Sequence, residues 1–218
     1  MILALETSSL VCGASLHENG ECIAESYLQE ARVHAEKLVG LVGQLLEDQT
    51  IRVEKLRAVI VSAGPGSFTG LRIGMSFAKG LVYPNKIPLA GVNTMNAYLA
   101  ATRDTAKDAE QPVWVIRSHR DYIYAAALQD PAGPLEIRYG QIRELKDWFP
   151  DCRHIISNEA LAELGDSLRV SERPVLPSMI GDYYIRYGND SAGTDYDSLV
   201  LEYGMDYKPK EWKPDTAV

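Results

Sequence analysis

A glycine-rich segment places the strongest constraint on the fold of this chain. Residues 64–74 read GPGSFTGLRIG, between a short apolar run and a stretch with helical spacing. Glycine reaches positive φ at little cost, so the Gly-Pro-Gly start predicts a sharp reversal from a strand into a helix. Ser67 stands where the N-cap of that helix belongs. The segment therefore predicts a strand–turn–helix unit.

Small residues recur at every fourth position along this helix. They are Gly66, Gly70, Gly74 and Ala78. A glycine inside a soluble helix lowers stability by about 0.5–1 kcal/mol relative to alanine, so Gly70 and Gly74 indicate that another backbone comes close. From the residues alone two explanations stay open. The helix packs on the chain's own sheet, or it meets a helix of a second protein, with Leu71 and Met75 beside the stripe.

Composition narrows the functional classes. The chain has 218 residues and a net charge of −8. It contains no run of Lys or Arg, so strong nucleic-acid binding by the chain alone is not expected, because phosphate contacts need clustered cations. The three cysteines lack CxxC spacing, which favours a reducing compartment. No signal-peptide pattern and no bilayer-length apolar run are visible, so we expect a cytoplasmic protein without membrane contact.

The order of predicted elements in the first hundred residues indicates the fold class. Three strands come first, and Asn19-Gly20 marks a type I′ hairpin between the second and the third. Helices and buried strands then alternate. The predicted strands cover 2–7, 11–18, 21–28, 57–63 and 88–92, and the predicted helices 34–48, 67–82 and 94–102. This order suggests an α/β fold, with one lobe of the actin, Hsp70 and sugar-kinase architecture.

A polar stretch at 103–111 predicts a boundary between two lobes. The first lobe would cover 1–103 and a second, smaller α/β lobe 104–206, its end free to pack back on the first lobe, with a tail over 207–218. The second lobe is predicted to hold strands at 113–118, 122–129, 135–142 and 154–157, helices at 144–149 and 159–168, and a last short helix or strand at 198–203. No internal repeat is visible.

Two neighbouring groups of residues are weak candidates for a phosphate site. They are Glu6, Thr7 and Ser8 at the end of the first strand, and Gly64, Gly66 and Ser67 in the glycine turn. A carboxylate with hydroxyls suits a phosphate or a metal-bound water, and a helix N-terminus favours anions. No Gly-Lys-Ser/Thr follows the turn, so it is not a Walker A loop, and a structural turn is favoured. We expect no cofactor, with ATP or Mg²⁺ only in a complex.

Four segments together resemble the TsaB (YeaZ) family, most clearly over residues 1–100. They are ILALETSS at the start, GPGSFTGLRIG, FAKGL at 77–81 and IPLAGVN at 87–93. The resemblance implies an actin-like, ribonuclease H-like (ASKHA) fold of two lobes. It implies a non-catalytic partner that binds and activates TsaD, which transfers a threonylcarbamoyl group to an adenosine beside the tRNA anticodon. A TsaE-like ATPase completes that assembly, and self-association as a homodimer is also implied.

The resemblance separates this chain from TsaD itself. TsaD holds a metal ion with two histidines four residues apart on one helix, and here Thr94 and Tyr98 occupy those positions. A hydroxyl and a phenol are weak ligands near neutral pH, so no metal site is predicted. No activated nucleophile is recognised either, so no catalytic residue is predicted.

The resemblance favours the interface explanation of the small-residue stripe, since TsaB proteins join TsaD through helices of the first lobe. The predicted interface comprises Gly70, Leu71, Gly74, Met75, Ala78, Leu38 and Val42. Two other functions stay open. One is a nucleotide-dependent transferase or hydrolase that acts alone with Glu6 and the glycine turn, and the other is a regulatory homodimer. In the second lobe an Asp-Ala-Arg-like family segment is replaced by residues 117–120, which read RSHR.

Overall fold

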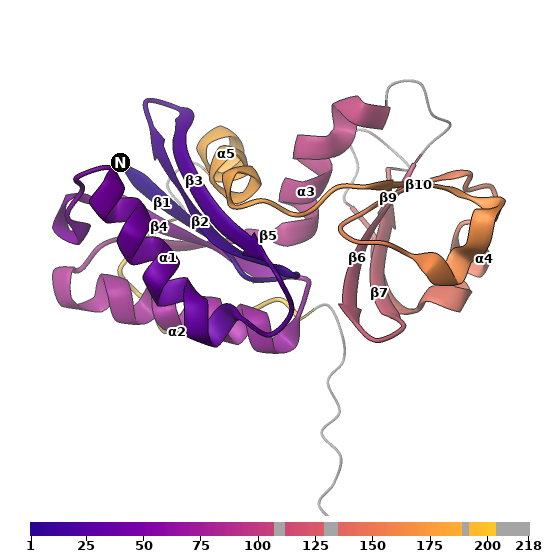
Figure 1. Ribbon diagram of the computed structural model, residues 1–218, viewed down its shortest axis with the longest axis horizontal. Helices are drawn as coiled ribbons and strands as arrows, with labels where there is room; N and C mark the ends of the chain where they lie inside the picture. Colours follow the sequence, from indigo (N-terminus) through magenta and orange to yellow (C-terminus); the bar gives the residue numbers. More distant parts are fainter. Residues whose placement is uncertain (107–111, 129–134, 189–191, 204–218) are drawn as a thin grey trace, which may run out of the picture.

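Two five-stranded sheets with their helices form the described part of the molecule (Figure 1). The computed structural model describes residues 1–106, 112–128, 135–188 and 192–203. The first sheet contains β1 (Ile2–Glu6), β2 (Val11–Glu18), β3 (Glu21–Gln29), β4 (Ala58–Gly64) and β5 (Leu89–Asn93). The second contains β6 (Val113–His119), β7 (Tyr122–Ala127), β8 (Ile137–Gln141), β9 (His154–Ser157) and β10 (Arg169–Glu172).

The helices lie between and outside these sheets. They are α1 (His34–Asp48), α2 (Phe68–Val82), α3 (Thr94–Thr102), α4 (Leu145–Trp148) and α5 (Pro177–Tyr187). Short 3₁₀ segments are η1 (Val53–Lys55), η2 (Tyr83–Asn85), η3 (Arg103–Ala106), η4 (Ile142–Glu144) and η5 (Ala162–Ser167). No helix in the described residues is long and apolar enough to cross a membrane.

The two sheets share one strand order and one set of strand directions. The strand order of the first sheet is β3-β2-β1-β4-β5. β2 pairs antiparallel with both β1 and β3, whereas β4 and β5 run parallel to β1. The second repeats this as β8-β7-β6-β9-β10. The chain therefore contains an internal repeat of topology that its residues do not reveal, because strand order depends on the pattern of buried faces rather than on residue identity. The repeat matches the predicted two-lobe, actin-like architecture.

Three apolar cores lie on the faces of the sheets. In β1, Leu3 and Leu5 point to the face that α1 and α2 cover, whereas Ile2 and Ala4 point to the opposite face. That opposite face packs against α3 and α5, and Trp114 of the second sheet joins the same core. A third core lies on the outer face of the second sheet, beside α4. The first four residues of β1 are apolar because both faces of the strand are covered.

The chain returns to the first lobe after the second sheet. α5 lies on the face of the first sheet opposite to α1 and α2 (Figure 1). Residues 192–203, here called the return segment, then run beside β5, where Leu89 and Gly193 exchange backbone hydrogen bonds of 2.9 and 3.1 Å. Leu199 and Leu201 pack against the core beneath α1 and α2.

The predicted elements of the first lobe are confirmed, and each end lies within one residue of its predicted position. The second half differs more. α5 and β10 were not predicted, the helix expected at 159–168 is only the 3₁₀ segment η5, and 198–203 holds neither helix nor strand. β10, η5 and residues 198–203 are short segments with little local periodicity, so tertiary contacts decide their conformation. α5 carries a local signal that the sequence analysis missed, since Pro177 stands in its first turn and one of its faces is apolar. The tail expected over 207–218 lies outside the described residues.

Candidate functional site

The glycines of the small-residue stripe face the turn that follows β1 in the same chain. A methyl group added at Gly66 would strike the backbone of Ser8, and one added at Gly70 or Gly74 would strike Thr7. The close approach that these glycines permit is therefore internal. This is the packing explanation that the sequence left open beside the interface.

The residues predicted for the partner interface are buried within the single chain. All seven, Gly70, Leu71, Gly74, Met75, Ala78, Leu38 and Val42, are enclosed between the two helices and the first sheet. These side chains pack internally, which supports the packing explanation, although Leu38 also lines a surface groove; the predicted partner interface stays a prediction. A partner that docks on this helix pair would meet its outer residues instead.

An apolar groove runs along the outer side of α1 and α2. It has a volume of about 490 Å³ and is lined by His34, Ala35, Leu38, Val39, Phe68, Thr69, Arg72, Ile73, Ser76 and Phe77. Val39 is 63% exposed although it is apolar. Gly40 and Gly43, also in α1, have open space where a Cβ atom would lie. Exposed apolar groups of this kind are typical of protein-contact surfaces.

The carboxylate of Glu6 closes the turn that follows β1. Its Oε1 accepts hydrogen bonds from the backbone N–H and from the hydroxyl of Ser8, both at 2.6 Å. Burial raises the pKa of Glu6 to about 7, although hydrogen bonds from neighbouring serines oppose the shift. Among the described residues, its Oε2 has no hydrogen-bond partner. The contacts of Glu6 are those of a group that holds a turn, as the structural explanation expects.

The glycine turn between β4 and α2 is covered by the chain itself. Gly64 has a φ of 108°, and a methyl group there would strike the carbonyl of Glu202 in the return segment. The N–H of Glu202 donates to the carbonyl of Ala63 at 2.8 Å, and the N–H of Ser67 donates to the carbonyl of Ser8 at 2.7 Å. Since these peptide groups bond internally, the structural turn is supported over the phosphate site.

Thr94 and Tyr98, which the resemblance aligns with the histidine pair of TsaD, are engaged in internal hydrogen bonds. The hydroxyl of Thr94 accepts from the N–H of Gly64 at 3.2 Å, and that of Tyr98 donates to the carbonyl of Arg173 at 2.8 Å. Burial raises the pKa of the Tyr98 phenol above its ordinary value, which disfavours a phenolate ligand. In the part of the chain that the structure describes, no three His, Cys, Asp or Glu residues are grouped to hold a metal.

A cavity of about 650 Å³ lies between the lobes. Its walls come from the β1–β2 turn, the N-termini of α1 and α2, and the β6–β7 turn. Arg32, Arg117 and Arg120 all line it, together with Glu159. The β1–β2 and β6–β7 turns thus face each other across the cavity, and they occupy equivalent positions in the two sheets.

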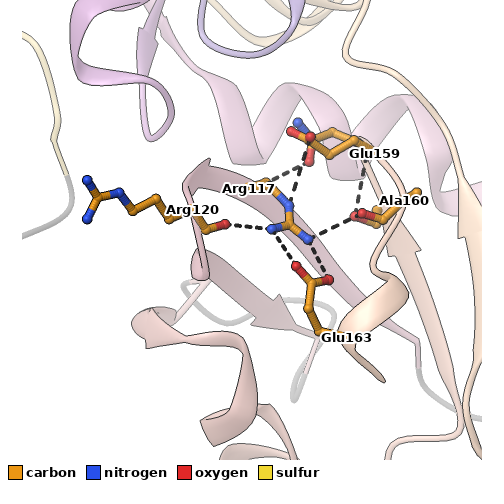
Figure 2. Close-up of polar contacts among 7 residues, drawn as sticks. Arg117, Arg120, Glu159, Ala160 and Glu163 are labelled. Atoms are coloured by element: carbon orange, nitrogen blue, oxygen red, sulfur yellow. Dashed lines mark hydrogen bonds and ion pairs between the residues drawn. The ribbon is translucent and has the colours of Figure 1, made fainter. Parts of the chain in front are cut away.

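Arg117 is held by a network within the second lobe (Figure 2). Its Nη1 and Nη2 donate to the two carboxylate oxygens of Glu163 at 3.0 and 2.9 Å, and they also donate to the carbonyls of Arg120 and Ala160. Its Nε lies 3.9 Å from the Oε2 of Glu159. Burial raises the pKa of Glu159, whereas the hydrogen bond from Arg117 lowers the pKa of Glu163. Arg117 therefore fixes the β6–β7 turn rather than offering a free cation to the cavity.

The structure also brings together a serine, a histidine and an aspartate that the sequence analysis did not associate. The Oγ of Ser15 lies 2.8 Å from the Nε2 of His17, and the Nδ1 of His17 lies 3.3 Å from Asp182 in α5. Ser15 and His17 are both buried, and Gly181 packs directly on the imidazole ring. A nucleophile needs an open approach for its substrate, so this arrangement ties α5 to β2 rather than forming a hydrolytic site.

Similarity to known proteins decides the family. A family model described as TsaD, tRNA N6-adenosine threonylcarbamoyltransferase, matches residues 23–130. The chain is 31% identical to the tRNA threonylcarbamoyladenosine biosynthesis protein TsaB of Bacillus subtilis over 175 residues, which cover 80% of this chain and 69% of the relative. This chain belongs to the TsaB family.

Two further comparisons bear on this TsaB-family chain. It is 28% identical to TsaB of Haemophilus influenzae over 123 residues, which span 56% of this chain and 51% of that relative. The solved structure of YeaZ from Pseudomonas aeruginosa matches with a TM-score of 0.65 at 24% identity, covering 93% of this chain and 98% of that one. The structural match confirms the predicted two-lobe fold class.

Sequence reasoning named candidate residues in the first lobe of this TsaB-family chain but missed contacts that depend on distant residues. Ser15 and His17 are two apart on a strand, so a shared face could have been inferred. Nothing in the sequence signals that Asp182 lies beside them. The contacts of the return segment with the glycine turn gave no local signal either, because 202 and 64 lie far apart along the chain.

Proposed function

We propose that this chain is a non-catalytic accessory subunit of tRNA threonylcarbamoyladenosine biosynthesis, which binds and activates a TsaD-like threonylcarbamoyltransferase. The observation that carries the proposal is the family membership, since the Bacillus subtilis relative is named a threonylcarbamoyladenosine biosynthesis protein. The matching family model describes the transferase TsaD itself. The assembly would work in the cytoplasm, with a TsaE-like ATPase and with ATP or Mg²⁺ bound only in the complex.

The polar groups described above support an accessory role over independent catalysis. Ser15 is buried against His17, and Thr94 is bonded to the glycine turn. Glu6 is enclosed at the end of β1. Catalysis needs a nucleophile or base that faces a space for the reacting atom. Among these groups of the described chain, none faces such a space.

The groove of α1 and α2 supplies the surface that an activator needs. Its lining is mostly apolar, and the lining residue Val39 is exposed. Burying apolar surface is the main source of association free energy. The stripe buried beneath the groove keeps the two helices close to the sheet, so the docking surface is preformed.

The proposal is tested by adding this chain to, or omitting it from, a threonylcarbamoylation assay with the organism's own TsaD-like and TsaE-like proteins and tRNA. We expect activity to fall sharply on omission. A Val39→Glu variant should bind the TsaD-like subunit at least about tenfold more weakly, because docking would bury an unpaired carboxylate. Val200→Glu is the matched control, since Val200 is 71% exposed and lies outside the groove.

Two outcomes would overturn the accessory role. One is robust turnover by this chain alone, which would favour the independent enzyme. The other is full activity of the remaining proteins without it. Light scattering of the isolated chain, at several concentrations, separates the regulatory homodimer from a chain that associates only with its partner.

A further inference from the structure

The return segment contacts the side chain of Arg72, one of the residues that line the groove. The ring centroids of Phe68 and Tyr203 lie 4.7 Å apart. The guanidinium carbon of Arg72 lies 3.9 Å from the centroid of Phe68 and 5.7 Å from that of Tyr203. The Nε of Arg72 donates to the hydroxyl of Tyr203 at 3.0 Å. Two aromatic contacts and one hydrogen bond therefore orient an arginine that would otherwise be free to rotate.

The charge of this arginine is not neutralised by the described residues. No ion pair joins Arg72 to an acidic side chain within residues 1–106, 112–128, 135–188 and 192–203. None of the residues that line the groove is acidic, although the whole chain has a net charge of −8. With Nε bonded to Tyr203, the two terminal nitrogens remain as a planar pair of donors. A carboxylate is the group that matches such a pair.

We propose that Arg72 recognises an acidic side chain on an apolar helix of the TsaD-like subunit, and that Tyr203 is the residue that positions it. The proposal rests on the proposed function, because it names the chemistry of the partner in that complex. The apolar groove takes the helix, and the carboxylate on that helix meets Arg72 in the wall of the groove. Charge complementarity of this kind selects the partner and its register.

Tyr203 itself is fixed mainly through its backbone. Its carbonyl accepts a hydrogen bond from the hydroxyl of Tyr124 in the second lobe at 2.6 Å. The preceding residue, Glu202, donates its N–H to Ala63 and accepts from the side chain of Asn93 at 2.6 Å. A Tyr203→Phe variant thus keeps the segment and the ring in place and removes only the acceptor of Arg72.

The test is a calorimetric titration of the TsaD-like subunit with the full chain at low and high salt. Arg72→Gln should weaken binding about thirtyfold or more, as expected when one member of a buried charge pair is lost. Tyr203→Phe should weaken it about fivefold or less, because the ring contacts with Arg72 persist. Arg52→Gln, which changes an exposed arginine outside the groove, is the matched control and should bind like the wild type.

A second measurement looks for the carboxylate directly. In an Arg72→Lys variant, a zero-length carbodiimide can join the new amine to a partner carboxylate as an amide, while the reagent takes up the water lost. We expect a cross-linked peptide that contains position 72 and an acidic residue of the TsaD-like subunit. The wild type, with arginine at this position, should not form that peptide.

The outcomes separate this inference from the proposed function. If the wild type binds and Arg72→Gln binds equally well with no cross-link at position 72, the recognition is wrong and the accessory role stands. If the wild type does not bind the TsaD-like subunit, both are wrong. If Arg72→Gln instead dissociates a homodimer in light scattering and leaves the complex intact, the occupant is a second copy and the inference is overturned.

Discussion

Gly70 and Gly80 lie in the same helix but in different surroundings. The Cβ position of Gly70 is taken by the backbone of Thr7, whereas nothing lies within 4 Å of the Cβ position of Gly80. We expect Gly70→Ala to lower the free energy of unfolding by about 1–3 kcal/mol, because a backbone neighbour cannot move aside easily. Gly80→Ala should raise it by about 0.5–1 kcal/mol through helix propensity alone. Urea denaturation measures both changes.

This pair of variants also decides between the two explanations of the stripe. A Gly70→Ala chain that is as stable as the wild type but fails to bind the TsaD-like subunit would show that the stripe contacts the partner. A destabilised chain with normal affinity at low temperature would keep it internal. The matched Gly80→Ala variant measures how much an alanine in α2 changes stability where it meets no neighbour.

Glu6 predicts a pH dependence of stability at a single residue. Its pKa is raised from the ordinary value of 4.5 to about 7 by burial. Between these values the folded chain keeps a proton that the unfolded chain has released, so stability falls as pH rises through this window. The contribution of protonated Glu6 to the stability of the folded chain is fully present below pH 4.5 and is lost above about pH 7. A pKa difference of this size between the folded and unfolded chains lowers the free energy of unfolding by about 3 kcal/mol across the window.

The matching variant is Glu6→Gln, whose neutral amide resembles the protonated carboxyl group in size. Denaturation of both chains from about pH 4.5 to about pH 8 should show a flatter stability profile for the variant, because the titrating group is gone. Parallel profiles for the two chains would mean that the carboxylate is ionised when folded, and that the serine hydrogen bonds outweigh its burial.

At the scale of elements, the first lobe could be predicted because its signals are local. Helix α1 shows its buried residues at helical spacing, and α2 begins at a serine whose hydroxyl accepts a hydrogen bond from the N–H of Gly70 at 3.3 Å. The hairpin of β2 and β3 follows from Asn19, which has the positive φ that its turn requires. In each case the residues that decide the conformation are close in sequence.

The elements that were missed are stabilised by distant partners. α5 lies against β2 through His17 and Asp182, and a backbone N–H near its start, that of Ser178, donates to Glu25 of β3 at 2.6 Å. The return segment has no helix or strand of its own beyond the bridge to Leu89. The return segment carries no periodic pattern of its own, and nothing local signals the partners of α5, so these contacts become visible only in the fold. The contact between Tyr203 and Arg72 at the candidate docking site could not be predicted for the same reason, since the two residues lie 131 positions apart in the sequence.

At the scale of the whole molecule, the two lobes share a core. Ile180 of α5 and Tyr98 of α3 lie in the same apolar cluster as Ile2 of the first sheet and Trp114 of the second. Because this cluster contains side chains of both lobes, unfolding of one lobe would expose apolar side chains of the other. The shared core therefore leads us to expect that the two sheets and their helices unfold as one unit.

This sharing predicts that damage in one lobe is felt in the other. Leu145 is fully buried in the outer core of the second lobe, far from the first sheet in the order of layers. Leu145→Ala should lower the free energy of unfolding by about 2–5 kcal/mol. If the chain unfolds as one unit, hydrogen exchange of the slowest amides in β4 should accelerate by the same factor as that of the slowest amides in β9. Acceleration confined to β9 would show that the lobes unfold separately. Equal acceleration in β4 and β9 means that the apolar cluster shared by the two sheets couples their stability. The α1–α2 groove, which lies on the first sheet, then depends on the stability of the entire chain.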